Sequence, residues 1–176
     1  MMEIEEIIDS ALEYWIEKEV NSIPGDVPSD MRTGKVEDDW VYWKPITSAV
    51  TEDEISAFEK DLGIKLPREL VSIIKHKHFV ELHIGEVEIF SMPSKGWQFS
   101  ISQGIYDSWP SEFIINKGYL PFAVYSDWGL WCFNLNEEEK EGIYPIYLWD
   151  HEDADNFQFV APTLKLALNA EYEKNA

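Results

Sequence analysis

Carboxylates grouped closely in a chain can hold Ca²⁺ or perform acid/base catalysis, and residues 150–155 contain such a group. Its members are Asp150, Glu152, Asp153 and Asp155. The stretch departs from the calcium-loop pattern, because the glycine of the sharp turn is missing and Ala154 stands at position five. Two interpretations stay open: a solvated acidic loop, which the pattern favours, and an acidic patch that binds a protein partner.

Three histidines, His76, His78 and His83, are close enough in sequence to suggest a metal site. The alternative is that basic side chains at the end of a helix interact favourably with its dipole, and we favour this alternative. The sequence has no phosphate-binding glycine loop, no Gly-x-Ser-x-Gly elbow, no paired-cysteine zinc spacing and no His-Glu-x-x-His motif. We therefore expect no metal, no cofactor and no enzymatic activity.

Two tryptophans receive opposite predictions. Trp43 precedes a well-capped helix and is predicted to be a buried anchor of the fold, whereas Trp128 lies in a tight turn beside Asp127, where a large ring is partly exposed. Exposed aromatic side chains are common anchors of protein interfaces. If the strand after this turn is antiparallel to the next one, the turn and the acidic loop share one end of the sheet. The predicted partner-binding surface is therefore Asp127, Trp128, Asp150, Glu152, Asp153 and Asp155.

The composition limits the possible partners. The chain has 176 residues, 45% of them hydrophobic and 14% aromatic, which is enough apolar area for a packed core and excludes disorder as the main state. A formal net charge of −20 disfavours nucleic acid and anionic membranes as partners. It favours a basic protein partner, although solubility alone is an alternative reason for the charge. The lone Cys132, an acidic N-terminus and the lack of a long apolar run predict a cytoplasmic protein.

Helices are expected in the first half of the chain. Apolar residues at helical spacing predict an amphipathic N-terminal helix within residues 1–22, and residues 23–39 are predicted to be an exposed connecting loop. A capping box at Thr51 and a C-terminal Gly63 bound the next helix. Another helix begins at Pro67.

Strands dominate the second half. After residue 78 the apolar period changes to two, which predicts a hairpin with Gly85 leading a type II′ turn. Short helices are expected within residues 97–118, followed by strands at residues 120–125, 130–135 and 143–149 and a final helix from Pro162. Helices, then an antiparallel strand meander, then a C-terminal helix define an α+β class. We expect a single domain over residues 1–176, with its core in residues 40–170.

Several segments together resemble one known family. Residues 43–46 (Trp-Lys-Pro-Ile), the capped segment 50–55 and residues 62–67 (Leu-Gly-Ile-Lys-Leu-Pro) resemble the opening signature of the SUKH superfamily, which includes the fungal Smi/Knr-type regulator of cell-wall synthesis. Residues 120–122 (Leu-Pro-Phe) and the turn and strand at 127–133 look like its second half, as does the Tyr-Pro-Ile-Tyr run that begins at Tyr144. The resemblance covers roughly residues 40–168, with Asn134 where the family is expected to prefer Asp.

The resemblance implies an α+β domain without a catalytic motif. Many bacterial members of the family look like immunity proteins that bind and neutralise a cognate toxin, often a nuclease. The strong negative charge agrees with this role, because nucleases that grip phosphates present basic surfaces. The alternatives are a regulatory or scaffold module of the Smi/Knr type and a metal-dependent enzyme that uses the acidic loop.

Overall fold

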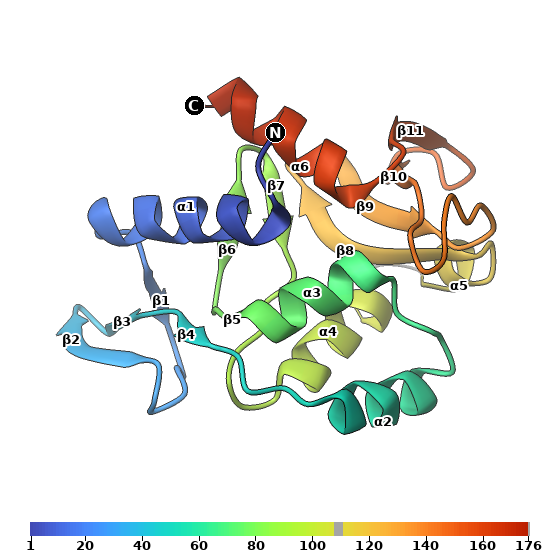
Figure 1. Cartoon of the computed structure of the whole chain (residues 1–176). Helices are drawn as coiled ribbons and strands as arrows, with labels where there is room; N and C mark the ends of the chain where they lie inside the picture. The colour runs from blue at the N-terminus through green and yellow to red at the C-terminus, as the bar shows by residue number, and fades with distance from the viewer. Residues whose placement is uncertain (108–110, 176) are drawn as a thin grey trace.

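The computed structural model describes residues 1–107 and 111–175 (Figure 1). The helices are α1 (Ile4–Glu17), α2 (Glu52–Leu62), α3 (Arg68–His76), α4 (Trp97–Tyr106), α5 (Ser111–Ile115) and α6 (Leu164–Asn175). The strands are β1 (Ser22–Pro24), β2 (Arg32–Glu37), β3 (Trp40–Trp43), β4 (Ile46–Thr47), β5 (Lys77–His78), β6 (Leu82–Ile84), β7 (Val87–Ile89), β8 (Tyr119–Tyr125), β9 (Gly129–Asn134), β10 (Ile146–Asp150) and β11 (Phe157–Ala161).

The largest sheet in the described part of the chain has six antiparallel strands in the order β11-β10-β9-β8-β7-β6. The predicted hairpin and the predicted meander are therefore parts of one sheet, since β7 pairs with β8 although α4 and α5 lie between them in sequence. Every residue of β9 is buried, which marks the middle of the sheet as core. The predicted α+β class, with a strand meander followed by a C-terminal helix, is confirmed.

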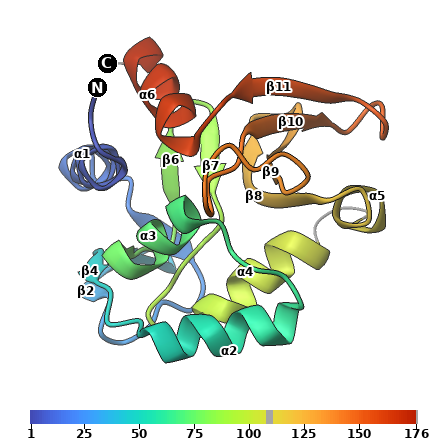
Figure 2. The same cartoon turned by 45° about the vertical axis from the view of Figure 1, so that its right-hand side comes forward.

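Helices pack against this sheet, and one of them contacts both edge strands. The C-terminal α6 contacts both β11 and β6, while α4 and α5 pack against β8 (Figure 2). The N-terminal α1 packs against α3, α6 and the edge strand β6. The two chain ends lie near each other in both views, and the Asn169 side chain exchanges two hydrogen bonds with the Met2 backbone, at 2.8 and 3.0 Å.

Local capping chemistry sets the helix and turn boundaries as predicted. At the start of α2, the Thr51 hydroxyl accepts from the Glu54 amide at 3.3 Å, and the Glu54 carboxylate accepts from the Thr51 amide at 2.8 Å. Gly63 ends this helix in the left-handed conformation, with φ 68°. Gly85 has φ 61°, and no positive φ is found at Glu86, which fits the predicted type II′ turn rather than type I′.

Several segments differ from the prediction, among them strands β3, β4 and β5, which were not expected. The expected connecting loop over residues 23–39 contains part of β1 and all of β2, which pair with β3 in a separate sheet. Strand β11 was not predicted, and β10 begins at Ile146 rather than at residue 143. The last helix begins at Leu164 instead of Pro162, because Thr163 supplies its cap through its hydroxyl, which accepts from the Leu166 amide at 3.2 Å.

Trp43 is buried, as predicted. Its relative exposure is 0%, and it belongs to the core cluster that also contains residues of α1 and α6. Its backbone amide donates to the Asn21 carbonyl at 2.9 Å, and its carbonyl accepts from the Asn21 side chain. Within the described residues its indole Nε1 has no hydrogen-bond partner, so packing rather than polar contacts determines the position of the ring.

Candidate partner-binding surface

Strand register brings the predicted Asp127–Trp128 turn and the 150–155 loop side by side. Gly129 at the start of β9 is paired with Asp150 at the end of β10, so both segments emerge at the same end of the sheet. The Trp128 carbonyl accepts from the His151 amide at 3.2 Å and lies 2.9 Å from His151 Nδ1. Since a carbonyl only accepts, this contact places a proton on Nδ1. The two segments thus form one connected surface.

The turn that carries Trp128 depends on a glycine. Gly129 has φ 152°, and a Cβ built there would lie 1.8 Å from the Trp149 carbonyl oxygen. Only glycine therefore lets β9 begin this close to β10. The turn is closed by the Trp128 amide, which donates to the Tyr125 carbonyl at 3.0 Å, and Ser126 adopts a positive φ of 45°. These backbone constraints fix the direction in which Trp128 leaves the sheet.

Trp128 projects into solvent while its neighbours in the sheet do not. Its relative exposure is 59%, whereas Trp131 and Trp149 are each 2% exposed. Asp127 beside it is also exposed. Because the backbone of the turn is already constrained, only the side-chain rotamers of this exposed indole lose freedom when a partner covers it, which suits an interface anchor.

Two of the predicted acidic residues hold the loop together. The Asp150 carboxylate accepts from the Glu152 amide at 2.9 Å and from the Asn156 side chain at 3.4 Å. The Asp153 carboxylate accepts from the Asp155 amide at 3.2 Å. These contacts shape the loop, so Asp150 and Asp153 have a structural role besides any role in binding.

The remaining loop carboxylates differ in their pairing. Asp155 forms an ion pair with Lys117, and Lys117 also lies 5.7 Å from the centroid of the Phe157 ring. The Glu152 side chain is exposed, and no ion pair to it is found among the described residues. Among the described residues, Glu152 and Asp127 are therefore the carboxylates of this surface that neither hold the loop nor form an ion pair.

An aromatic row borders this surface and was not predicted. The Tyr119 ring stacks on Phe157 with centroids 3.8 Å apart and meets Tyr147 edge-on at 5.6 Å. Tyr147 in turn contacts Phe159, which is 58% exposed. The sequence signal was present, because Phe157 and Phe159 are two residues apart in a short β-prone run, but a single short edge strand gives a weak pattern.

The three candidate histidines do not come together. His76 Nε2 lies 2.8 Å from Asp9 Oδ1, the buried His78 has Nδ1 3.2 Å from the Met92 carbonyl, and His83 stacks on Trp15. Across residues 1–107 and 111–175, no group of three or more His, Cys, Asp or Glu side chains is placed to hold a metal ion, the acidic loop included. No helix in those same ranges is long and apolar enough to cross a membrane.

Comparison with known families identifies the chain. The model of the SMI1 / KNR4 family (SUKH-1) matches residues 49–169, a region that runs from the start of α2 into α6. The match covers more than half of the chain, so the protein belongs to this family, and the resemblance to the SUKH superfamily is confirmed. No curated protein matches the chain. Helix α1 and strands β1, β2, β3 and β4 precede the matched region.

Proposed function

We propose that this protein is a non-catalytic binding domain that binds and neutralises a basic bacterial toxin, of nuclease type, in the manner of immunity proteins. The observation that carries the proposal is the exposed Trp128, held by a constrained turn beside an acidic loop. The ring supplies an apolar anchor, and the carboxylates attract a basic surface and accelerate its association.

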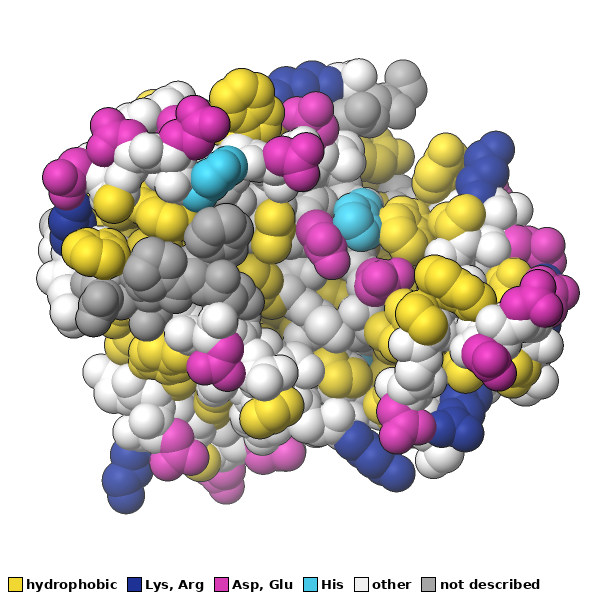
Figure 3. All heavy atoms as spheres, turned by 180° about the vertical axis from the view of Figure 1, so that it is seen from behind, with side chains coloured by type: hydrophobic (Ala, Val, Ile, Leu, Met, Phe, Trp, Pro, Cys, Tyr) yellow, Lys and Arg dark blue, Asp and Glu magenta, His cyan; other side chains and the backbone are white. Residues whose placement is uncertain are grey.

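The distribution of charge supports a basic partner. The chain carries 34 acidic and 14 basic residues. Figure 3 shows that on the face opposite to that of Figure 1 the lysine and arginine side chains lie toward the rim, while acidic side chains lie both at the rim and in the middle of the face. A basic toxin domain meets little like-charge repulsion on such a face, whereas a polyanion is repelled by it.

The test starts with capture of the partner by the tagged protein from its own host, followed by identification by mass spectrometry. The proposal requires that the captured protein is basic, that it is toxic when expressed alone, and that co-expression of this chain restores growth. Trp128→Ala should weaken the rescue. Trp40→Ala is the matched control, because Trp40 is also exposed, at 46%, but lies in the separate β1–β3 sheet.

A regulatory or scaffold module of the Smi/Knr cell-wall type is the second candidate, and the matched family carries that name. The same capture distinguishes the two candidates. A partner that is not toxic when expressed alone, and whose activity or location changes when this chain is deleted, would contradict the immunity function and favour regulation.

A further inference from the structure

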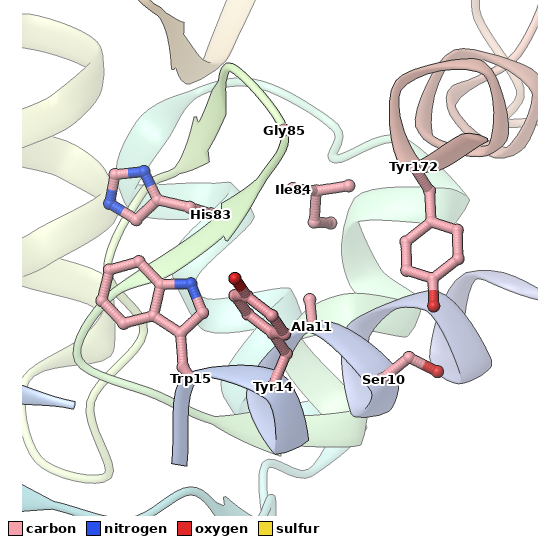
Figure 4. A pocket seen from close by; sticks show the side chains of 8 residues that line it. All are labelled: Ser10, Ala11, Tyr14, Trp15, His83, Ile84, Gly85 and Tyr172. Atoms are coloured by element: carbon pink, nitrogen blue, oxygen red, sulfur yellow. The ribbon is translucent and has the colours of Figure 1, made fainter. Parts of the chain in front are cut away.

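A cavity of about 470 Å³ lies between α1, β6 and α6 (Figure 4). Tyr14 and Trp15 line it from α1, His83 from β6, and Tyr172 from α6. Tyr14, Trp15 and Tyr172 lie outside residues 49–169, the region matched by the family model. Most of the aromatic wall therefore comes from parts of this chain that lie outside the matched region.

The walls of the cavity are aromatic rings with polar edges. Figure 4 shows the Trp15 and His83 rings on one side and the Tyr172 ring on the other. Trp15 and His83 stack with their centroids 4.7 Å apart and their planes 10° apart, which fixes this side. The hydroxyls of Ser10, Tyr14 and Tyr172 add hydrogen-bonding groups to an otherwise apolar lining.

Charged side chains of both signs lie near the cavity. Burial lowers the pKa of His83, so its imidazole is neutral at neutral pH and brings no positive charge. Glu88 Oε1 lies 3.9 Å from His83 Nε2. Burial, and then the charge of Glu88, raise the pKa of Glu81, which indicates that these two carboxylates are near each other. One cation is also present: Lys18 Nζ lies 5.5 Å from the centroid of the exposed Tyr14 ring.

We propose that this cavity receives an arginine side chain of the basic protein partner. A planar guanidinium stacks on aromatic rings and donates hydrogen bonds to hydroxyl oxygens such as those of the lining. It is also attracted by a carboxylate outside the lining, here Glu88, which lies 3.9 Å from the lining residue His83. A purely apolar side chain would leave the Ser10, Tyr14 and Tyr172 hydroxyls without partners in a covered site. The inference rests on the proposed function for the basic nature of the partner, but the chemistry of the cavity is tested without that partner.

The probe is N-acetyl-arginine N-methylamide, and its neutral isostere N-acetyl-citrulline N-methylamide is the matched control ligand. Binding is followed by NMR on the indole N–H resonance of Trp15, which is identified by its loss in Trp15→Phe. We expect a saturable shift with a Kd of about millimolar, as suits one small ligand, and binding of the citrulline analogue at least about fivefold weaker. Equal shifts with both ligands, or no saturable shift at Trp15, would overturn the proposal.

A charge variant tests the role of the carboxylate. Glu88→Gln keeps the size of the side chain and should weaken arginine binding about three- to tenfold, while Asp61→Asn on α2 makes the same charge change elsewhere and should leave it unchanged. An equal loss in both variants would show a general charge effect and refute the assignment. If the probe binds selectively but capture from the host yields no toxin, the proposed function fails and the cavity assignment stands. If capture yields a toxin whose affinity is the same for the parent protein, Trp15→Phe and Glu88→Gln, the proposed function stands and the cavity assignment fails.

Discussion

At the scale of single residues, the same side chain type serves opposite purposes. Trp43 is fully buried and Trp128 is 59% exposed, although both are tryptophans beside polar residues. The sequence predicted this difference, because Trp43 precedes a capped helix that must turn onto the core, and Trp128 stands in a tight turn. It did not predict the stack of Trp15 on His83, since 68 positions separate the two and only the fold brings them together.

Trp43→Ala should lower the free energy of unfolding by about 3–5 kcal/mol, because it removes a fully buried ring and leaves a cavity. Trp40→Ala, three positions earlier on the same strand, should cost less than about 1 kcal/mol, since that ring is 46% exposed. Urea unfolding of both variants measures the difference. A loss below about 1 kcal/mol for Trp43→Ala would contradict the anchoring role.

His83 makes the stability depend on pH. Burial lowers its pKa from the ordinary value of 6.5, with Glu88 acting weakly in the opposite direction. The unfolded chain therefore binds a proton more readily than the folded chain, and stability falls as the pH drops through 6.5 towards the lower folded value. The stability of the parent protein relative to His83→Gln should decrease between about pH 7.5 and pH 5.5. Urea unfolding at both pH values measures this, and a constant difference would refute it.

At the scale of elements, prediction succeeded where local chemistry decides the structure. The capping box at Thr51, the C-terminal Gly63 and the turn at Gly85 act within a few residues, so they can be recognised without the fold. Strand β2 was missed because almost all of its residues are exposed, which removes the apolar alternation that identifies a strand. Strand β11 lies at an edge of the sheet and carries a similarly weak pattern.

Thr51→Ala should destabilise the protein by about 1 kcal/mol, because it removes the hydroxyl that accepts from the Glu54 amide at the start of α2. Thr51→Ser retains the hydroxyl and should restore most of the stability. The change in the free energy of unfolding of each variant follows from the midpoint of its urea unfolding curve, compared with the parent protein at equal slope of the free energy against urea concentration. An Ala variant as stable as the Ser variant would show that the cap contributes nothing to α2.

At the scale of the whole molecule, elements outside the family match pack against the matched region. Helix α1 precedes the matched residues 49–169, yet Ile7, Ile8 and Leu12 belong to the same buried cluster as the sheet. It was predictable that the Asp127–Trp128 turn and the 150–155 loop lie at the same end of the sheet, because antiparallel order places the turn before β9 next to the loop after β10. The pairing of Asp155 with Lys117 was not, since contacts between such distant positions depend on the tertiary structure.

These pairings decide which charges should steer a basic partner. Asp150 and Asp153 also hold the loop, and Asp155 is paired with Lys117, so among the described residues Asp127 and Glu152 are the carboxylates beside Trp128 that can be neutralised without breaking such a contact. The double variant Asp127→Asn/Glu152→Gln should lower the association rate several-fold at about 50 mM salt and much less at about 300 mM, where exposed charges are largely screened. Asp53→Asn/Asp61→Asn on α2 removes the same charge elsewhere and controls for the net effect.

Trp128→Ala should change mainly the dissociation rate constant. Removing a ring that a partner desolvates leaves long-range attraction intact, so the association rate and its salt dependence should stay close to those of the parent protein. The dissociation rate should rise by about tenfold or more, as expected for the loss of an anchor worth more than about 1 kcal/mol. Surface plasmon resonance with the captured partner, at both salt concentrations, separates the two effects. If neither rate constant changes in this variant or in the Asp127/Glu152 double variant, the partner binds elsewhere, and the acidic face of α1 becomes the next surface to test.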